Sequence, residues 1–207
     1  MDPKLLLLFI PTFAAISITP GMCMTLAMSL GISQGWRRTL WMMLGELTGV
    51  ALVAVAAVAG VATTMLNYPT AFRVFCILGG CYLVYLGVRQ WRSKEKITLH
   101  DAADKSPQLG RVTLVVQGFV TAIANPKGWA FMVAFLPPFI SDQFPVHTQM
   151  IGLLVVIVSI EFISLMIYAS GGGQLSRWLA RGQRLHLINK VSGSMMMVIG
   201  VWLAVLH

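Results

Sequence analysis

The 207-residue chain is 57% hydrophobic and only 11% charged, with a mean hydropathy of +0.78. This composition excludes a soluble globular domain, so we expect the lipid bilayer to be its solvent. The formal charge of +8 does not indicate nucleic-acid binding, because no polar domain carries the basic residues. The predicted fold class is an all-α integral membrane protein.

Six apolar segments are candidates for transmembrane helices, since crossing the hydrocarbon core takes about 20 residues. They are Leu5–Ser33, Leu40–Met65, Ala71–Trp91, Val112–Ile140, Gln149–Ser170 and Val191–Leu206. The first and the fourth carry a proline near the middle, at Pro20 and Pro126, and we expect both helices to be broken there. If the first segment is re-entrant instead, five spans remain.

The basic residues predict the orientation of these segments. Twelve of the 15 lysines and arginines lie in or beside the loops after segments one, three and five, while Lys4 and Arg73 fall on the other side. Cytoplasmic loops are enriched in basic residues. This places the three basic loops in the cytoplasm and both termini in the periplasm, and it predicts a multi-pass protein of the bacterial inner membrane.

The domain organisation is predicted to be one membrane domain, 1–207, made of two related halves. A basic polar linker, 93–110, separates residues 1–92 from residues 111–207, and each part holds three spans. Homologous halves with an odd number of spans insert in opposite orientations, as in the inverted repeats of secondary transporters. The alternative is that Pro20 and Pro126 match by coincidence, because proline is frequent in membrane helices.

Two motifs mark the predicted breaks: Pro20-Gly21 in the first half and Asn125-Pro126-Lys127-Gly128 in the second. A new half-helix can begin just after each proline, with its N-terminus facing the membrane interior. Such an end carries a partial positive charge and free N–H donors, which suit a carboxylate. The alternative is that both prolines only kink their helices for packing.

Glu46 and Glu161 are the two carboxylates within the predicted spans, and Lys127 lies about 15 residues from either end of its span. An ammonium group is costly in lipid unless it is paired or hydrated, so Lys127 is expected to pair with one of the glutamates. Gly45 and Gly49 flank Glu46 and would let another helix approach closely. Strict inverted symmetry does not make the two glutamates equivalent. The alternative is a buried ion pair that only orients helices.

This inventory fits a zwitterionic small molecule such as an amino acid. Its carboxylate would lie against a half-helix N-terminus or Lys127, and its ammonium group against Glu46 or Glu161. A carboxyl group removed from water takes up a proton more readily, so one glutamate is expected to couple transport to the proton gradient. The sequence predicts no enzyme activity, catalytic residue, cofactor or metal site.

Several motifs in order along nearly the whole chain resemble the LysE/RhtB family of bacterial amino-acid exporters. They are Pro20-Gly21, Gly45-Glu46, the run from Gly79 to Gly87, Asn125-Pro126-Lys127, and the run from Phe135 to Phe139. The resemblance implies proton-driven export of an amino acid or close derivative, with homoserine or threonine favoured. Met22 and Glu46 depart from the Pro and Asp that are frequent in the family, which leaves the substrate open. A homodimer is compatible with the sequence.

Three other functions are considered. A small-ion exporter or channel would need rings of carbonyl or carboxylate groups, which two glutamates beside a lysine do not supply. A thiol–disulfide electron carrier would need a cysteine at the second break to partner Cys23, and none is there. A membrane scaffold without transport activity is disfavoured by the charged residues inside the spans.

Overall fold

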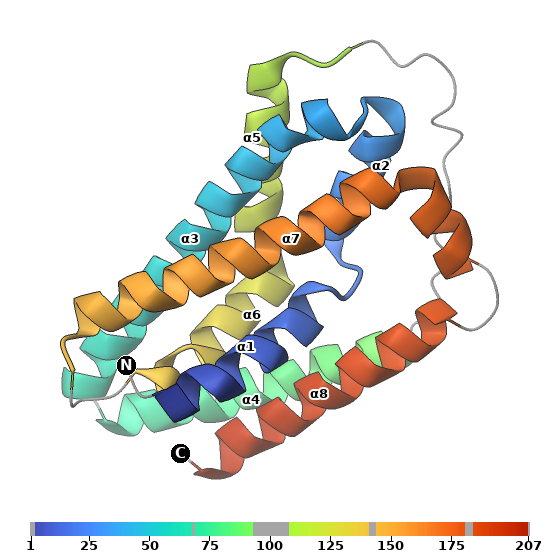
Figure 1. Cartoon of the computed structure of the whole chain (residues 1–207). Coiled ribbons are helices and arrows are strands. Elements are labelled where there is room, and N and C mark those ends of the chain that lie inside the picture. The colour runs from blue at the N-terminus through green and yellow to red at the C-terminus, as the bar shows by residue number, and fades with distance from the viewer. Residues whose placement is uncertain (1–2, 68, 93–107, 141–143, 181–183, 207) are drawn as a thin grey trace.

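The computed structural model describes residues 3–67, 69–92, 108–140, 144–180 and 184–206, and these ranges are helical apart from short connections. The elements are α1 (Pro3–Ser17), α2 (Met22–Ser33), α3 (Trp36–Asn67), α4 (Pro69–Arg92), α5 (Arg111–Ala124), α6 (Pro126–Phe135), the 3₁₀ helix η1 (Pro137–Phe139), α7 (Val146–Ala180) and α8 (Arg184–Leu206). Within the described ranges there is no β-strand, so the all-α fold class is confirmed. Figure 1 shows the arrangement.

Each predicted segment corresponds to one helix or to one broken set of helices. The first segment forms α1 and α2, which are bent by 56° relative to each other. The fourth forms α5, α6 and η1, and the remaining four form α3, α4, α7 and α8. The predicted breaks at Pro20 and Pro126 are therefore confirmed.

The helix ends differ from the ends of the apolar segments. α3 begins at Trp36 rather than Leu40, and α8 begins at Arg184 rather than Val191. Hydropathy marks only the part of a helix suited to lipid, whereas helical hydrogen bonding continues into polar sequence. α7 likewise continues past Ser170 to Ala180, but it turns sharply at Gly172 (φ 30°, ψ −118°), a conformation open mainly to glycine (Figure 1).

Length and apolar composition identify the best candidates for membrane spans. Among the described residues, α3 over Trp36–Gly60 and α7 over Val146–Gly172 are each long and apolar enough to cross a bilayer. The bent pair of α1 and α2 adds a third candidate if it is counted as one span. The chain is accordingly a multi-pass membrane protein.

Pairs of glycines let the helices of the two halves pack closely. α4 lies along α8 (Figure 1), and a Cβ atom added to Gly80 would come within 2.5 Å of the Gly200 carbonyl oxygen. A Cβ atom added to Gly200 would likewise come within 2.5 Å of the Gly80 carbonyl oxygen. Gly87 and Gly193 face each other's carbonyl oxygen in the same way. Since Gly80 faces Gly200 and Gly87 faces Gly193, the two helices run antiparallel.

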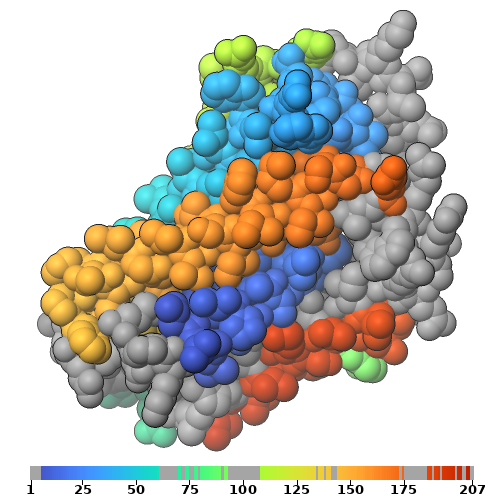
Figure 2. Space-filling view, in the orientation of Figure 1, coloured from blue at the N-terminus to red at the C-terminus, as the bar shows by residue number. Residues whose placement is uncertain are grey.

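Similar close packing joins α3 to α5. A Cβ atom on Gly49 would lie 2.7 Å from the Cβ atom of Ala122, and one on Gly45 would clash with the Val115 carbonyl oxygen. The expectation that Gly45 and Gly49 admit a neighbouring helix is therefore confirmed, and that helix is α5. On the face shown in Figure 2, α1 lies between α7 and α8.

The interior contains two apolar clusters. One is built mainly from α1, α3 and α6, with residues of α7 packed against them, and includes the stacked rings of Phe9, Phe13 and Phe135. The other includes Cys23, Met24 and their neighbours from α3 and α7. The first helix break lies between them, with Ile16 in one cluster and Cys23 in the other.

Candidate functional site

The first break leaves the N-terminus of α2 without a side-chain cap. Gly21 occupies the N-cap position in an extended conformation and supplies no side-chain hydrogen bond. Ser, Thr, Asp or Asn at that position would accept from the first free N–H groups of the helix. Gly21, Cys23 and Met24 line a cavity, so the uncapped end of α2 borders it. This end is suited to a negatively charged group.

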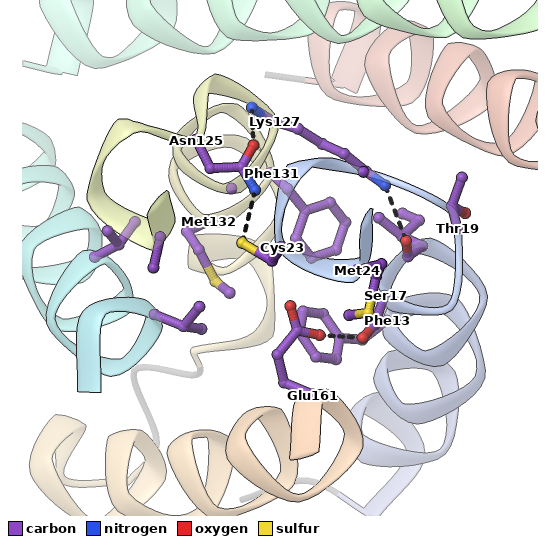
Figure 3. A pocket seen from close by; sticks show the side chains of 16 residues that line it. Phe13, Ser17, Thr19, Cys23, Met24, Asn125, Lys127, Phe131, Met132 and Glu161 are labelled. Carbon is purple, nitrogen blue, oxygen red and sulfur yellow. Dashed lines mark hydrogen bonds between the residues drawn. The ribbon is translucent and has the colours of Figure 1, made fainter. Parts of the chain in front are cut away.

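The second break is built differently, because Asn125 caps α6. Its side-chain oxygen accepts a hydrogen bond from the Lys127 backbone N–H at 3.1 Å, and Pro126 follows as the first helical residue. The side-chain amide of Asn125 also donates to the Cys23 sulfur at 3.6 Å (Figure 3). Asn125 therefore occupies part of the α6 N-terminus and joins it to the first turn of α2.

Lys127 reaches from the second break to the first. Its ammonium group donates to the carbonyl oxygen of Ile16 at 3.1 Å (Figure 3). Ile16 lies in the last turn of α1, where free carbonyl groups give the helix end a partial negative charge. A Cβ atom on Gly21 would lie only 3.9 Å from the same ammonium nitrogen. The partner of Lys127 is thus a main-chain oxygen, not the carboxylate expected from the sequence.

Glu161 approaches the first break from α7. Its carboxylate accepts a hydrogen bond from the Ser17 hydroxyl group, which also lies 3.1 Å from the Ser164 hydroxyl oxygen. One helical turn farther on, the Tyr168 hydroxyl donates to the Ile18 carbonyl oxygen at 2.8 Å. Residues spaced by three and seven lie on one face of a helix. One face of α7 therefore holds the open backbone of the first break.

Glu46 lies deeper than the other charged residues. Its side chain is fully buried on α3, and neither carboxylate oxygen has a hydrogen-bond partner. It does not line the cavity, but it lies beside Cys23, which does. A buried polar group without a partner needs an explanation beyond packing.

The cavity lies where the two breaks meet (Figure 3). About 50 Å³ of it is open to water-sized molecules, which is room for roughly four waters. Its polar and ionisable lining residues are Ser17, Thr19, Cys23, Asn125, Lys127 and Glu161. The arrangement offers one cation, one carboxylate and one uncapped helix N-terminus to a small molecule.

Comparison with known proteins identifies the family. The LysE type translocator model matches residues 14–207. The chain belongs to this family.

Curated relatives of this translocator match over nearly their full length. The "Homoserine/homoserine lactone efflux protein" of Salmonella typhimurium is 28% identical over 95% of this chain and 94% of its own. An "Uncharacterized membrane protein" of Vibrio cholerae is 29% identical over 99% of this chain and 98% of its own. No solved structure matches. Family membership and these membrane relatives identify a membrane efflux protein.

The cavity of this family member brings together most of the residues predicted from the sequence. Gly21, Asn125, Lys127, Gly128 and Glu161 line it. Pro20 and Pro126 are not in the lining, although they open the two breaks. Glu46 is not in the lining either, but it lies beside the lining residue Cys23.

Three residues of the site, Ser17, Ser164 and Tyr168, were not predicted from the sequence. Ser164 and Tyr168 share a helix face with Glu161, so their spacing was the available signal. Ser17 had a weaker signal, its position three residues before Pro20.

Proposed function

We propose that the protein exports an amino acid or a close derivative, such as homoserine or threonine, from the cytoplasm across the inner membrane. The observation that carries the proposal is the cavity, where the cation of Lys127 and the carboxylate of Glu161 face one small space beside the α2 N-terminus. A zwitterion matches these groups. The names of the Salmonella relatives, which mention homoserine and its lactone, support the same substrate class.

The proposed substrate takes the place of hydrogen-bond partners that Lys127 and Glu161 have within the protein. Its carboxylate takes the ammonium group of Lys127 and the free N–H groups at the start of α2. Its ammonium group takes the carboxylate of Glu161. In the structure these two side chains bind Ile16 and Ser17, both at the end of α1. Binding would therefore release the end of α1 from two contacts, which links occupancy of the cavity to movement of this helix.

Proton antiport is proposed to use Glu46. Its carboxyl group is fully buried, has no hydrogen-bond partner and lies beside the cavity-lining Cys23. Gain or loss of a proton there changes the charge of an otherwise apolar interior. Glu46→Gln should abolish the dependence of efflux on an imposed pH gradient in membrane vesicles. Thr48→Ala, a change on an exposed position of the same helix, is the control, and undiminished coupling in Glu46→Gln would refute the role.

We further propose six spans arranged as two inverted repeats, with both termini in the periplasm. The antiparallel packing of α4 on α8 supports the inverted arrangement. α1 begins and α8 ends at the same end of the molecule (Figure 1), which favours an even number of spans. Labelling of single cysteines at Lys4 and in the 93–110 linker by a membrane-impermeant reagent tests this. The topology is wrong if the linker reacts from the periplasm.

Export itself is tested in cells that lack their own amino-acid exporters. Cells that express the protein are loaded with dipeptides, and the amino acids that appear outside are measured over time. We expect at least one amino acid to leave faster than from cells without the protein. The export proposal fails if none does while the protein is present in the membrane.

A further inference from the structure

The cavity that is proposed to bind the substrate is lined by polar groups at the two helix breaks and by apolar side chains elsewhere. Apart from its polar groups, the lining consists of apolar side chains from α1, α2, α3, α5 and α6. The largest of these are Phe13, Ile16, Met24, Val50, Val53, Phe131 and Met132. The division carries information about the substrate's side chain.

The two charged groups of the lining match the two charges of a zwitterion, and the described lining residues include no further charged group. Among the described residues that line the cavity there is one ammonium group, that of Lys127, and one carboxylate, that of Glu161. A lysine or arginine substrate brings a third charge that needs a second carboxylate, and Glu46 is outside the lining. A glutamate substrate needs a second cation. An unpaired charge removed from water is costly, so charged side chains are disfavoured.

The uncharged polar groups are already engaged within the protein. Ser17 binds Glu161, and Asn125 binds both the Lys127 backbone and Cys23. The Thr19 hydroxyl donates to the Ala15 carbonyl oxygen at 2.9 Å. All three residues lie at the helix breaks, where the carboxylate and ammonium groups of the substrate are proposed to bind. The apolar side chains of the lining carry no hydroxyl, amide or charged group, so a hydroxyl group on the substrate side chain gains nothing against them.

The apolar wall is suited to a side chain of moderate size. The rings of Phe13 and Phe131 lie with their centroids 5.5 Å apart, and both side chains are buried. Met24 and Met132 add flexible thioether groups, which adapt to different shapes. These groups give an aliphatic or thioether side chain apolar contacts on several sides.

From this division we infer that the exported molecule is a neutral amino acid with an aliphatic or thioether side chain, of the size of valine, leucine or methionine. The inference rests on the proposed export function and changes its substrate, because the apolar lining favours an aliphatic side chain over the hydroxyl side chains of homoserine and threonine. The carboxylate and ammonium groups lie at Lys127 and Glu161, while the side chain lies against Val53, Met132 and Phe131.

Export rates of the wild-type protein test the inference. Cells are loaded with dipeptides that release leucine, methionine, homoserine, lysine or glutamate, and initial efflux rates are compared at equal internal concentrations. A hydrophobic pocket discriminates by about tenfold or more for each methylene group. We expect leucine and methionine to leave at least about tenfold faster than lysine and glutamate, and faster than homoserine. Export of lysine, glutamate or homoserine at the rate of leucine, or faster, would overturn the inference while leaving export intact. Absence of any export would overturn the proposed function as well.

A pair of matched variants tests the location of the side chain. Val53 lines the cavity and is buried, whereas Val55 on the same helix is exposed. Val53→Thr adds a hydroxyl group at nearly constant size, and we expect it to lower the ratio of leucine export to homoserine export by about tenfold. Val55→Thr should leave the ratio unchanged. An unchanged ratio in Val53→Thr, with export retained, would contradict the assignment of this wall. If Val53→Thr does not reach the membrane, the wild-type rates decide.

Discussion

Replacing Lys127 with methionine separates the structural role of this residue from its proposed role in binding. Methionine keeps a side chain of similar length and removes the ammonium group. The lost hydrogen bond ends at the Ile16 carbonyl oxygen, which also accepts from the Thr19 backbone N–H at 3.2 Å. Since that oxygen keeps a partner, we expect the free energy of unfolding to fall by no more than about 1 kcal/mol.

The expected effect on transport is much larger. A hydrogen bond to a charged group contributes about 1.5–3 kcal/mol, which corresponds to about 10- to 150-fold in affinity. Uptake of labelled leucine into inside-out vesicles, measured over a range of concentrations, should show a KM raised by this factor. Thr121→Ala on α5 is the control, because that hydroxyl group binds only its own helix, at the Gln117 carbonyl oxygen. A wild-type KM in Lys127→Met, at normal protein level, would refute the assignment of the substrate carboxylate.

Three further predictions concern charge, capping and packing. Glu161→Gln should lower the efflux rate by at least about tenfold, whereas Ser159→Ala, two residues earlier at an exposed position of α7, should not. Equal rates in vesicles would exclude Glu161 from the site. Asn125→Ala removes the α6 cap and should lower the free energy of unfolding in detergent by about 0.5–2 kcal/mol, and an unchanged Tm would contradict this. Gly87→Ala crowds the Gly193 carbonyl oxygen at 2.6 Å and should cost about 1–3 kcal/mol. Gly60→Ala is the control, because a Cβ atom there meets no atom within 4 Å. Equal losses in the free energy of unfolding for the two variants would contradict the packing argument.

The sequence predicted the all-helical fold and the two helix breaks because both depend on local properties. An apolar run reports preference for lipid, and a proline inside it reports a missing N–H and a clash with the preceding turn. The turn at Gly172 was not predicted. Three consecutive glycines at 171–173 indicated the end of a helix, whereas the chain resumes a helical course after one non-helical residue.

The sequence predicted which residues line the cavity better than it predicted which groups they contact. Charged groups inside apolar segments stand out in a sequence, and Lys127 and Glu161 do line the cavity. Their partners were not predictable in the same way. The partner of Lys127 is the carbonyl oxygen of Ile16, and every residue has a carbonyl group, so no side chain identifies it. The difference between the two half-helix ends was accessible, since asparagine is a strong N-cap residue and glycine a weaker one.

The contact between Gly87 and Gly193 has a consequence for the origin of the chain. Gly87 lies 67 residues after Pro20, and Gly193 lies 67 residues after Pro126. In the inverted-repeat proposal the two glycines are therefore the same residue of the repeat, touching its own copy. A residue that meets its own copy lies on a two-fold axis, as in the interface of a symmetric dimer. In this proposal an ancestral gene of half this length would have made such a dimer through this glycine, and gene fusion would then have freed Gly21 and its counterpart Lys127 to diverge.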